Sequence, residues 1–158
     1  MTRWLGLVCS AIAASGLLIV AAAPGLAETP SSASGSGTFT FIPNGPPRFA
    51  DGNVILSATL DGTITGTLSG TWTEQAIEVL HADGSATTHA MGSFNVAKPC
   101  GAGSFAFSLE GQQASATSSL TGQFRSVDLS SASVSIHTVD TFTVVSNSGF
   151  VYSGTFFC

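Results

Sequence analysis

The sequence predicts an all-β protein that forms a single antiparallel, eight-stranded meander barrel. Short segments rich in Thr, Ser, Val and Phe follow one another, separated by clusters of Gly, Asp, Ser and Asn. Gly-Thr-Phe or Gly-Ser-Phe recurs at 37–39, 92–94, 103–105 and 154–156, which suggests a glycine where backbones crowd, followed by an aromatic side chain directed into a core. No amphipathic helical period occurs after residue 27. Closure removes the exposed edges that such a sheet would present, so we favour a barrel over the alternative, a β-sandwich.

The first residues have the pattern of an export signal. Arg3 is followed by the largely apolar stretch 4–23 and then by Gly25-Leu26-Ala27, so residues 1–27 are predicted to be a signal peptide cleaved after Ala27. A retained membrane anchor is the alternative, because the apolar run approaches the ~20 residues that span a bilayer. With cleavage, we expect a secreted or periplasmic protein that is not held at the membrane. Residues 28–36 are predicted to be a flexible leader and 37–158 the barrel domain.

Composition excludes one class of partner. Beyond residue 27 the basic side chains are Arg48, Lys98 and Arg125, against nine acidic ones in the sequence. Nucleic-acid affinity depends on neutralising many phosphates, so nucleic acid is not an expected partner.

Cys100 and Cys158 are predicted to form a disulfide, since both lie in a segment that is expected to reach an oxidising compartment. The bridge would tie the end of the chain to the loop before Gly103. A thiol nucleophile at Cys100 and a shared metal site are the alternatives, but neither cysteine has another thiol or a histidine nearby. No cofactor is expected.

Taken in order, the strands are bounded by turn-forming residues. The segment 38–41 alternates with period two and stops at the proline-rich stretch 43–47; a second strand covers 54–60. Asp61-Gly62 is either a tight turn or a bend in one long strand that continues through Trp72. The two arms of the hairpin around Asp83-Gly84 are expected to be strands, and further strands are expected in the segments 103–109, 114–125, 133–145 and 150–157.

Three glycines spaced by four, Gly62, Gly66 and Gly70, point the same way in an extended strand. Glycines on one face of a strand indicate that the sheet curls or that another backbone passes closely there.

The hairpin around Asp83-Gly84 carries the most concrete chemistry. A two-residue type I′ turn would place Glu78 opposite His89, with Glu74 facing Ser93 farther along the same face. The opposite face would bring Ile77, Val79, Ala90 and Phe94 against something apolar. A carboxylate beside a histidine can act as a general acid and base, so Glu78, His89 and Glu74 are candidate catalytic residues. An exposed cross-strand ion pair is the alternative, and the sequence does not decide whether this face lines the interior.

The other histidines suggest no metal site. His81 lies beside the turn and His137 lies on the opposite face from Val134 and Ile136, so both are expected to face water. The spacing of His81, His89 and His137 matches no compact ligand motif, and no metal is expected.

Several short motifs also carry a family resemblance. The Gly-Thr-Phe start, the run Leu60-Asp61-Gly62-Thr63-Ile64-Thr65-Gly66-Thr67, the turn Asp83-Gly84-Ser85-Ala86 and the two Gly-Ser-Phe triplets resemble small bacterial proteins of unknown function that look like the allene oxide cyclase barrel. The resemblance spans about residues 37–109 and implies a lipocalin-like, eight-stranded fold whose interior holds an apolar small molecule. No catalytic residue of the plant cyclases aligns onto this chain, so cyclase activity is not implied.

The leading hypothesis is therefore an exported, non-catalytic barrel that binds a small apolar ligand. The candidate ligand contacts are the strand aromatics Trp72, Phe94, Phe105 and Phe107. An isomerase or cyclase that uses Glu78 and His89 is one alternative. A structural protein whose outer Thr/Ser surface contacts a partner is another.

Overall fold

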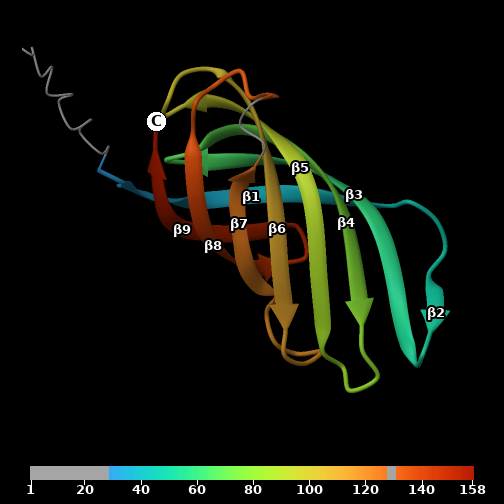
Figure 1. Ribbon diagram of the computed structural model, residues 1–158. Helices are drawn as coiled ribbons and strands as arrows, with labels where there is room; N and C mark the ends of the chain where they lie inside the picture. Colours follow the sequence, from blue (N-terminus) through green and yellow to red (C-terminus); the bar gives the residue numbers. More distant parts are fainter. Residues whose placement is uncertain (1–28, 128–130) are drawn as a thin grey trace, which may run out of the picture.

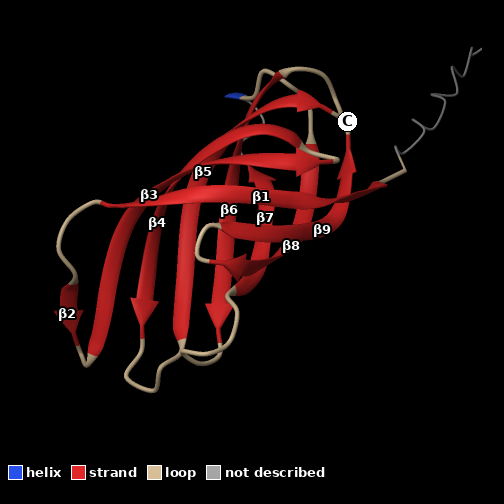
Figure 2. Ribbon diagram, turned by 180° about the vertical axis from the view of Figure 1, so that it is seen from behind, coloured by secondary structure: helices blue, strands red, loops and turns tan. Residues whose placement is uncertain are grey.

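The computed structural model describes residues 29–127 and 131–158, and strands make up nearly all of them (Figures 1 and 2). The predicted signal peptide lies outside the described residues. The strands are β1 (Ser31–Pro43), β2 (Arg48–Ala50), β3 (Asn53–Gly66), β4 (Ser69–Leu80), β5 (Ala86–Lys98), β6 (Gly103–Gln113), β7 (Thr121–Val127), β8 (His137–Ser146) and β9 (Gly149–Phe157). No helix among the described residues is long and apolar enough to cross a membrane.

The sheet closes on itself. From β3 to β9 each strand pairs antiparallel with the next, and β1 pairs with both β9 and β3. Among the described residues, the short strand β2 pairs only with the start of β3, so the barrel has eight strands there. The predicted barrel is confirmed over the sandwich. Closure leaves few unpaired strand edges for other chains to join.

The segment predicted to be a flexible leader is partly a strand. β1 begins at Ser31, and its residues 31–38 pair with β9. Small side chains suggested a disordered leader, but here they make room for aromatic rings. A Cβ atom on Gly35 would lie 2.7 Å from the Tyr152 ring, and one on Gly37 would lie 2.3 Å from the Phe150 ring. The prediction was wrong because residues 31–36 pair with β9 at the far end of the chain, which the composition of the segment does not reveal.

The glycine column marks crowded backbone, as expected, but the strand does not run on to Trp72. Asp61-Gly62 lies inside β3, which ends at Gly66, and the chain turns there before β4. Gly66 has a φ of 107°, which favours glycine. At Gly62, a Cβ atom would lie 2.7 Å from the indole of Trp72 and 2.0 Å from the Thr38 carbonyl oxygen.

One end of the barrel is filled by side chains. Leu68 and Ile136 are fully buried there, and Phe105 is 2% exposed. The Leu68 N–H donates a hydrogen bond to the Tyr152 hydroxyl over 2.9 Å, which ties the β3–β4 turn to β9. This packing closes the interior at that end.

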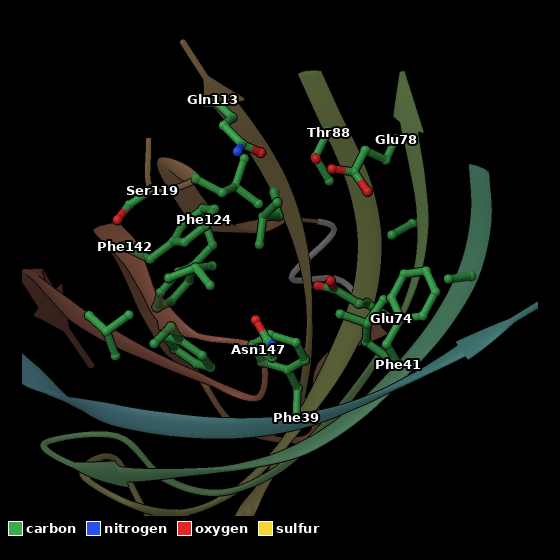
Figure 3. A pocket seen from close by; sticks show the side chains of 18 of the residues that line it. Phe39, Phe41, Glu74, Glu78, Thr88, Gln113, Ser119, Phe124, Phe142 and Asn147 are labelled. Carbon is green, nitrogen blue, oxygen red and sulfur yellow. The ribbon is translucent and has the colours of Figure 1, made fainter. Parts of the chain in front are cut away.

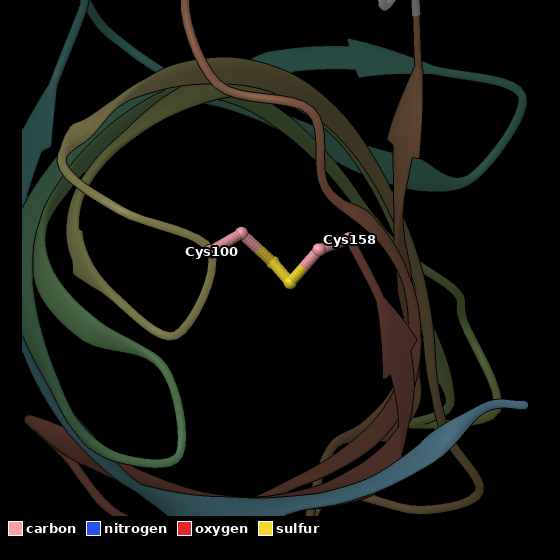
Figure 4. The surroundings of a disulfide bond; sticks show 2 residues. All are labelled: Cys100 and Cys158. Atoms are coloured by element: carbon pink, nitrogen blue, oxygen red, sulfur yellow. A yellow bond between two sulfur atoms is a disulfide. The ribbon is translucent and has the colours of Figure 1, made fainter. Parts of the chain in front are cut away.

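The disulfide is found at the same end. Cys100, in the β5–β6 loop, is bonded to Cys158, the last residue, with the two Cα atoms 5.4 Å apart. Figure 4 shows the bridge within the ring of strands. The predicted pairing is confirmed, and it holds the end of β9 against the loop.

Candidate functional site

A cavity of about 640 Å³ occupies the other end of the barrel, where the β4–β5, β6–β7 and β8–β9 connections lie. Most of its wall is aromatic or aliphatic. The side chains of this kind are Phe39, Phe41, Leu56, Ala58, Leu60, Trp72, Ala76, Phe94, Phe107, Leu109, Ala116, Leu120, Phe124, Phe142, Val144, Val145 and Phe150. The interior is therefore not filled by the phenylalanines, and a small molecule has room there (Figure 3).

The β4–β5 hairpin does not have the predicted register. Glu78 lies opposite Thr88, Ile77 lies opposite His89, and Glu74 lies opposite Gly92. Each residue of β4 thus faces a residue of β5 one position earlier than expected. Because side chains alternate between faces, this shift sends Glu78 to the interior and His89 to the exposed outer wall. The predicted Glu78–His89 pair does not form, and it cannot act as an acid and base.

The turn explains the shift. The Gly84 N–H donates to the His81 carbonyl oxygen over 3.0 Å, and the His81 N–H donates to that of Ser85 over 2.8 Å. Gly84 has a φ of 84°, and Asp83 Oδ1 accepts hydrogen bonds from the N–H and hydroxyl of Ser85. This is a three-residue loop ending in a left-handed glycine, which Asp-Gly supports as well as it supports the two-residue turn.

The inward face of β4 carries two carboxyl groups. Trp72, Glu74, Ala76 and Glu78 alternate with exposed residues and line the cavity. Ile77, which was expected to pack against an apolar surface, is instead 49% exposed on the outside. Figure 3 shows Glu74 and Glu78 reaching into the cavity from the same strand.

Glu74 is the more deeply placed of the two and is 5% exposed. It lies between Leu60 of β3 and Gly92 of β5. A Cβ atom on Gly92 would lie 2.7 Å from both the Glu74 Cβ and the Phe107 ring, so the glycine is what leaves space for this side chain.

Three buried polar atoms of residues that line the cavity have no hydrogen-bond partner among the described residues: Trp72 Nε1, Glu74 Oε2 and Thr88 Oγ1. A buried polar group without a partner costs about 1–3 kcal/mol, and such groups are rare in folded proteins. One donor, one carboxylate oxygen and one hydroxyl of these wall residues thus lack the hydrogen bonds that buried polar groups normally make.

Burial also changes the acidity of the carboxyl groups. It raises the pKa of Glu74 from 4.5 to about 7 and raises the pKa of Glu78 as well, because both side chains lose water. None of the described residues lining the cavity is a lysine, arginine or histidine that would offset this effect.

The remaining predicted residues are divided between the cavity and other places. Trp72, Phe94 and Phe107 line the cavity. Phe105 lies behind them toward the filled end and stacks on Phe94, with the ring centroids 5.2 Å apart. Two histidines lie elsewhere and contact neighbours. His81 Nδ1 is 3.3 Å from Asn53 Oδ1, and the His137 ring stacks on Phe157 with the centroids 4.5 Å apart.

Two polar residues of the interior were missed. Thr88 was placed on the wrong face by the register error. Asp140 of β8 is 1% exposed and accepts a hydrogen bond from the Thr138 hydroxyl, while its Oδ1 has no partner in the part of the chain that the structure describes. Burial raises the pKa of Asp140 to about 6. The alternation Thr138, Asp140, Phe142 on β8 was the available signal, but an aspartate in a Thr-rich strand is usually exposed.

Comparison with known proteins supports the fold. No family model matches the chain, and no curated protein matches it. The chain resembles the crystal structure of a protein with unknown function from the DUF3224 family of Shewanella oneidensis MR-1, with a TM-score of 0.65 and 19% sequence identity. The match covers 80% of this chain and 96% of that one. At this identity the likeness concerns the barrel fold alone.

Proposed function

We propose that this protein binds a small, largely apolar molecule in the cavity and does not transform it chemically. The cavity carries the proposal. Its volume of about 640 Å³ and its mostly aromatic and aliphatic wall match small-molecule sites, which typically measure about 300–1,000 Å³. A few convergent polar groups, namely Trp72, Glu74 and Thr88, would orient the ligand.

We also propose that the protein acts outside the cytoplasm and is a relative of the allene oxide cyclase barrels. The Cys100–Cys158 disulfide supports the location, because such bonds persist in oxidising compartments. The closed eight-stranded barrel with a cavity at one end supports the likeness. Glu78 and His89 cannot act together in catalysis, since the two side chains lie on opposite faces of the sheet.

A neutral fluorescent probe tests ligand binding. N-phenyl-1-naphthylamine is apolar and becomes fluorescent when it leaves water, so its emission should rise and saturate when it is titrated into the purified protein. An apolar extract of bacterial envelopes should compete with it.

The variant Ala76→Phe places a ring where the cavity now is, because Ala76 is 6% exposed and lines its wall. It should abolish the saturable signal. Ala97→Phe makes the same change at an exposed position on β5 and should leave the signal unchanged. Equal binding by both variants would show that the probe binds elsewhere and would contradict the proposal.

A further inference from the structure

The cavity combines an apolar wall with acidic groups only. Glu74 and Glu78 are the titratable side chains among the described residues that line it, and no cation lies beside them. They are separated by four positions on one strand, roughly 13 Å at the usual rise per residue. A ligand thus meets two carboxyl groups, Glu74 deep inside and Glu78 closer to the end of β4.

Of the two carboxyl groups, Glu74 would gain most from a hydrogen bond and a positive charge supplied by a ligand. Its side chain is about nineteen-twentieths buried and reaches into the cavity (Figure 3), and no described residue donates a hydrogen bond to Oε2. An ionised carboxylate in such a place is unfavourable unless a positive charge and N–H donors reach it. Since none of the described residues that line the wall is a cation, a ligand could supply this charge.

The surrounding aromatic rings would also favour a positively charged group on the ligand. The neighbouring inward position on β4 is Trp72, whose ring meets Phe94 at 6.5 Å and Phe150 at 6.0 Å between centroids. The faces of aromatic rings attract ammonium groups, most strongly that of tryptophan. Beyond them, Leu109, Phe124 and Phe142 provide a surface against which a hydrocarbon chain loses its contact with water.

We propose that the natural ligand is an amphiphilic amine, in which a protonated amino group lies against the Glu74 carboxylate and a hydrocarbon portion fills the apolar part of the cavity. This inference rests on the proposed binding function and names its ligand class. A fatty acid of the same length would bring a second negative charge next to Glu74 and Glu78 and would be rejected. An alcohol would bring one donor and no charge, so its affinity would lie between those of the amine and the fatty acid.

Titration calorimetry with three probes of equal chain length tests this: decylamine, decan-1-ol and decanoic acid, each below its aggregation concentration. At about pH 8.5, above the pKa of Glu74, decylamine should bind tightest, roughly tenfold or more tighter than decanoic acid, as expected for a charge-assisted hydrogen bond. The variant Glu74→Gln should lose most of this preference while keeping its affinity for decan-1-ol. Its amide has nearly the same shape as the carboxyl group, so the cavity is preserved.

Glu110→Gln is the matched control, because Glu110 is exposed on the outer face of β6. It should leave all three affinities unchanged, which shows that the effect of Glu74→Gln does not come from the loss of one negative charge alone. If decanoic acid binds as tightly as decylamine, or if Glu74→Gln leaves amine binding intact, the amine proposal is wrong while the binding function stands. If none of the three probes binds, both proposals fail.

Discussion

Replacing Glu74 with glutamine should stabilise the protein at alkaline pH and change its stability little at about pH 4. The carboxyl group is 5% exposed, and burial raises its pKa from 4.5 to about 7. The unfolded chain returns this group to water and to its ordinary pKa. Folding above pH 7 therefore forces a carboxylate into an apolar wall, whereas the glutamine carries no charge at any pH.

The sign and size follow from proton binding. Between pH 4.5 and 7 the folded protein holds a proton that the unfolded chain has released, so the free energy of unfolding falls as the pH rises through this window. A pKa shift of this size lowers the free energy of unfolding by roughly 3 kcal/mol, at ~1.4 kcal/mol per pH unit. The full loss is reached above pH 7. Asp140, whose pKa is also raised, titrates in both proteins, so the difference between the two curves reports on Glu74.

Urea denaturation at a series of pH values from about 4 to 9 measures the effect, with circular dichroism as the signal. The two curves should meet near pH 4 and separate steadily up to pH 7, with the variant more stable. Glu110→Gln, at an exposed position, should follow the wild type throughout. Parallel curves for Glu74→Gln and wild type would show that the carboxyl group is hydrated in the folded protein, and the reasoning on its burial would be refuted.

Three further changes test the packing, the turn and the disulfide. Gly92→Ala should lower the free energy of unfolding by about 1–3 kcal/mol, because the added methyl group would lie 2.2 Å from the Thr73 carbonyl oxygen and 2.7 Å from the Phe107 ring; an unchanged urea midpoint would show that the sheet can move apart there. Gly84→Ala should lower it by about 1 kcal/mol and Gly84→Asn by less, since asparagine tolerates a left-handed backbone; thermal unfolding should rank the three proteins in that order, and equal melting temperatures would argue against the three-residue loop. Replacing both Cys100 and Cys158 with serine should remove about 4 kcal/mol in the chain-entropy model, and a chemically reduced sample of the wild type should match the double variant.

The strands and the general architecture were predictable because their signals are local. Period-two alternation marked the strands, and the prolines after residue 42 marked the end of β1. Phe105 and Phe107 were expected on one face of a strand, and both are buried in the core. The barrel itself followed from the number of strands and from the need to cover their edges.

The register of the central hairpin was not predictable in the same way. Asp83-Gly84 is compatible with loops of two or three residues, and the choice between them moves every residue of β5 to the other face relative to β4. A register shift of one residue on β5 therefore separates the predicted Glu78–His89 pair from the observed Glu78–Thr88 pair. The hydrogen bonds of His81 and Gly84 in the folded loop select the three-residue loop, and with it the register of β4 and β5.

By itself, the sequence determined which residues share a face within each strand, and it determined the disulfide because only two cysteines follow the N-terminal segment. Only the tertiary structure decided which face is inside. β4 carries apolar residues on both faces, Trp72 and Ala76 on one and Ile77 and Val79 on the other, so its own alternation is ambiguous. The choice depends on the neighbouring strands: Gly62 and Gly92 leave space for Trp72 and Glu74, and closure of the barrel then encloses that face with its two carboxyl groups.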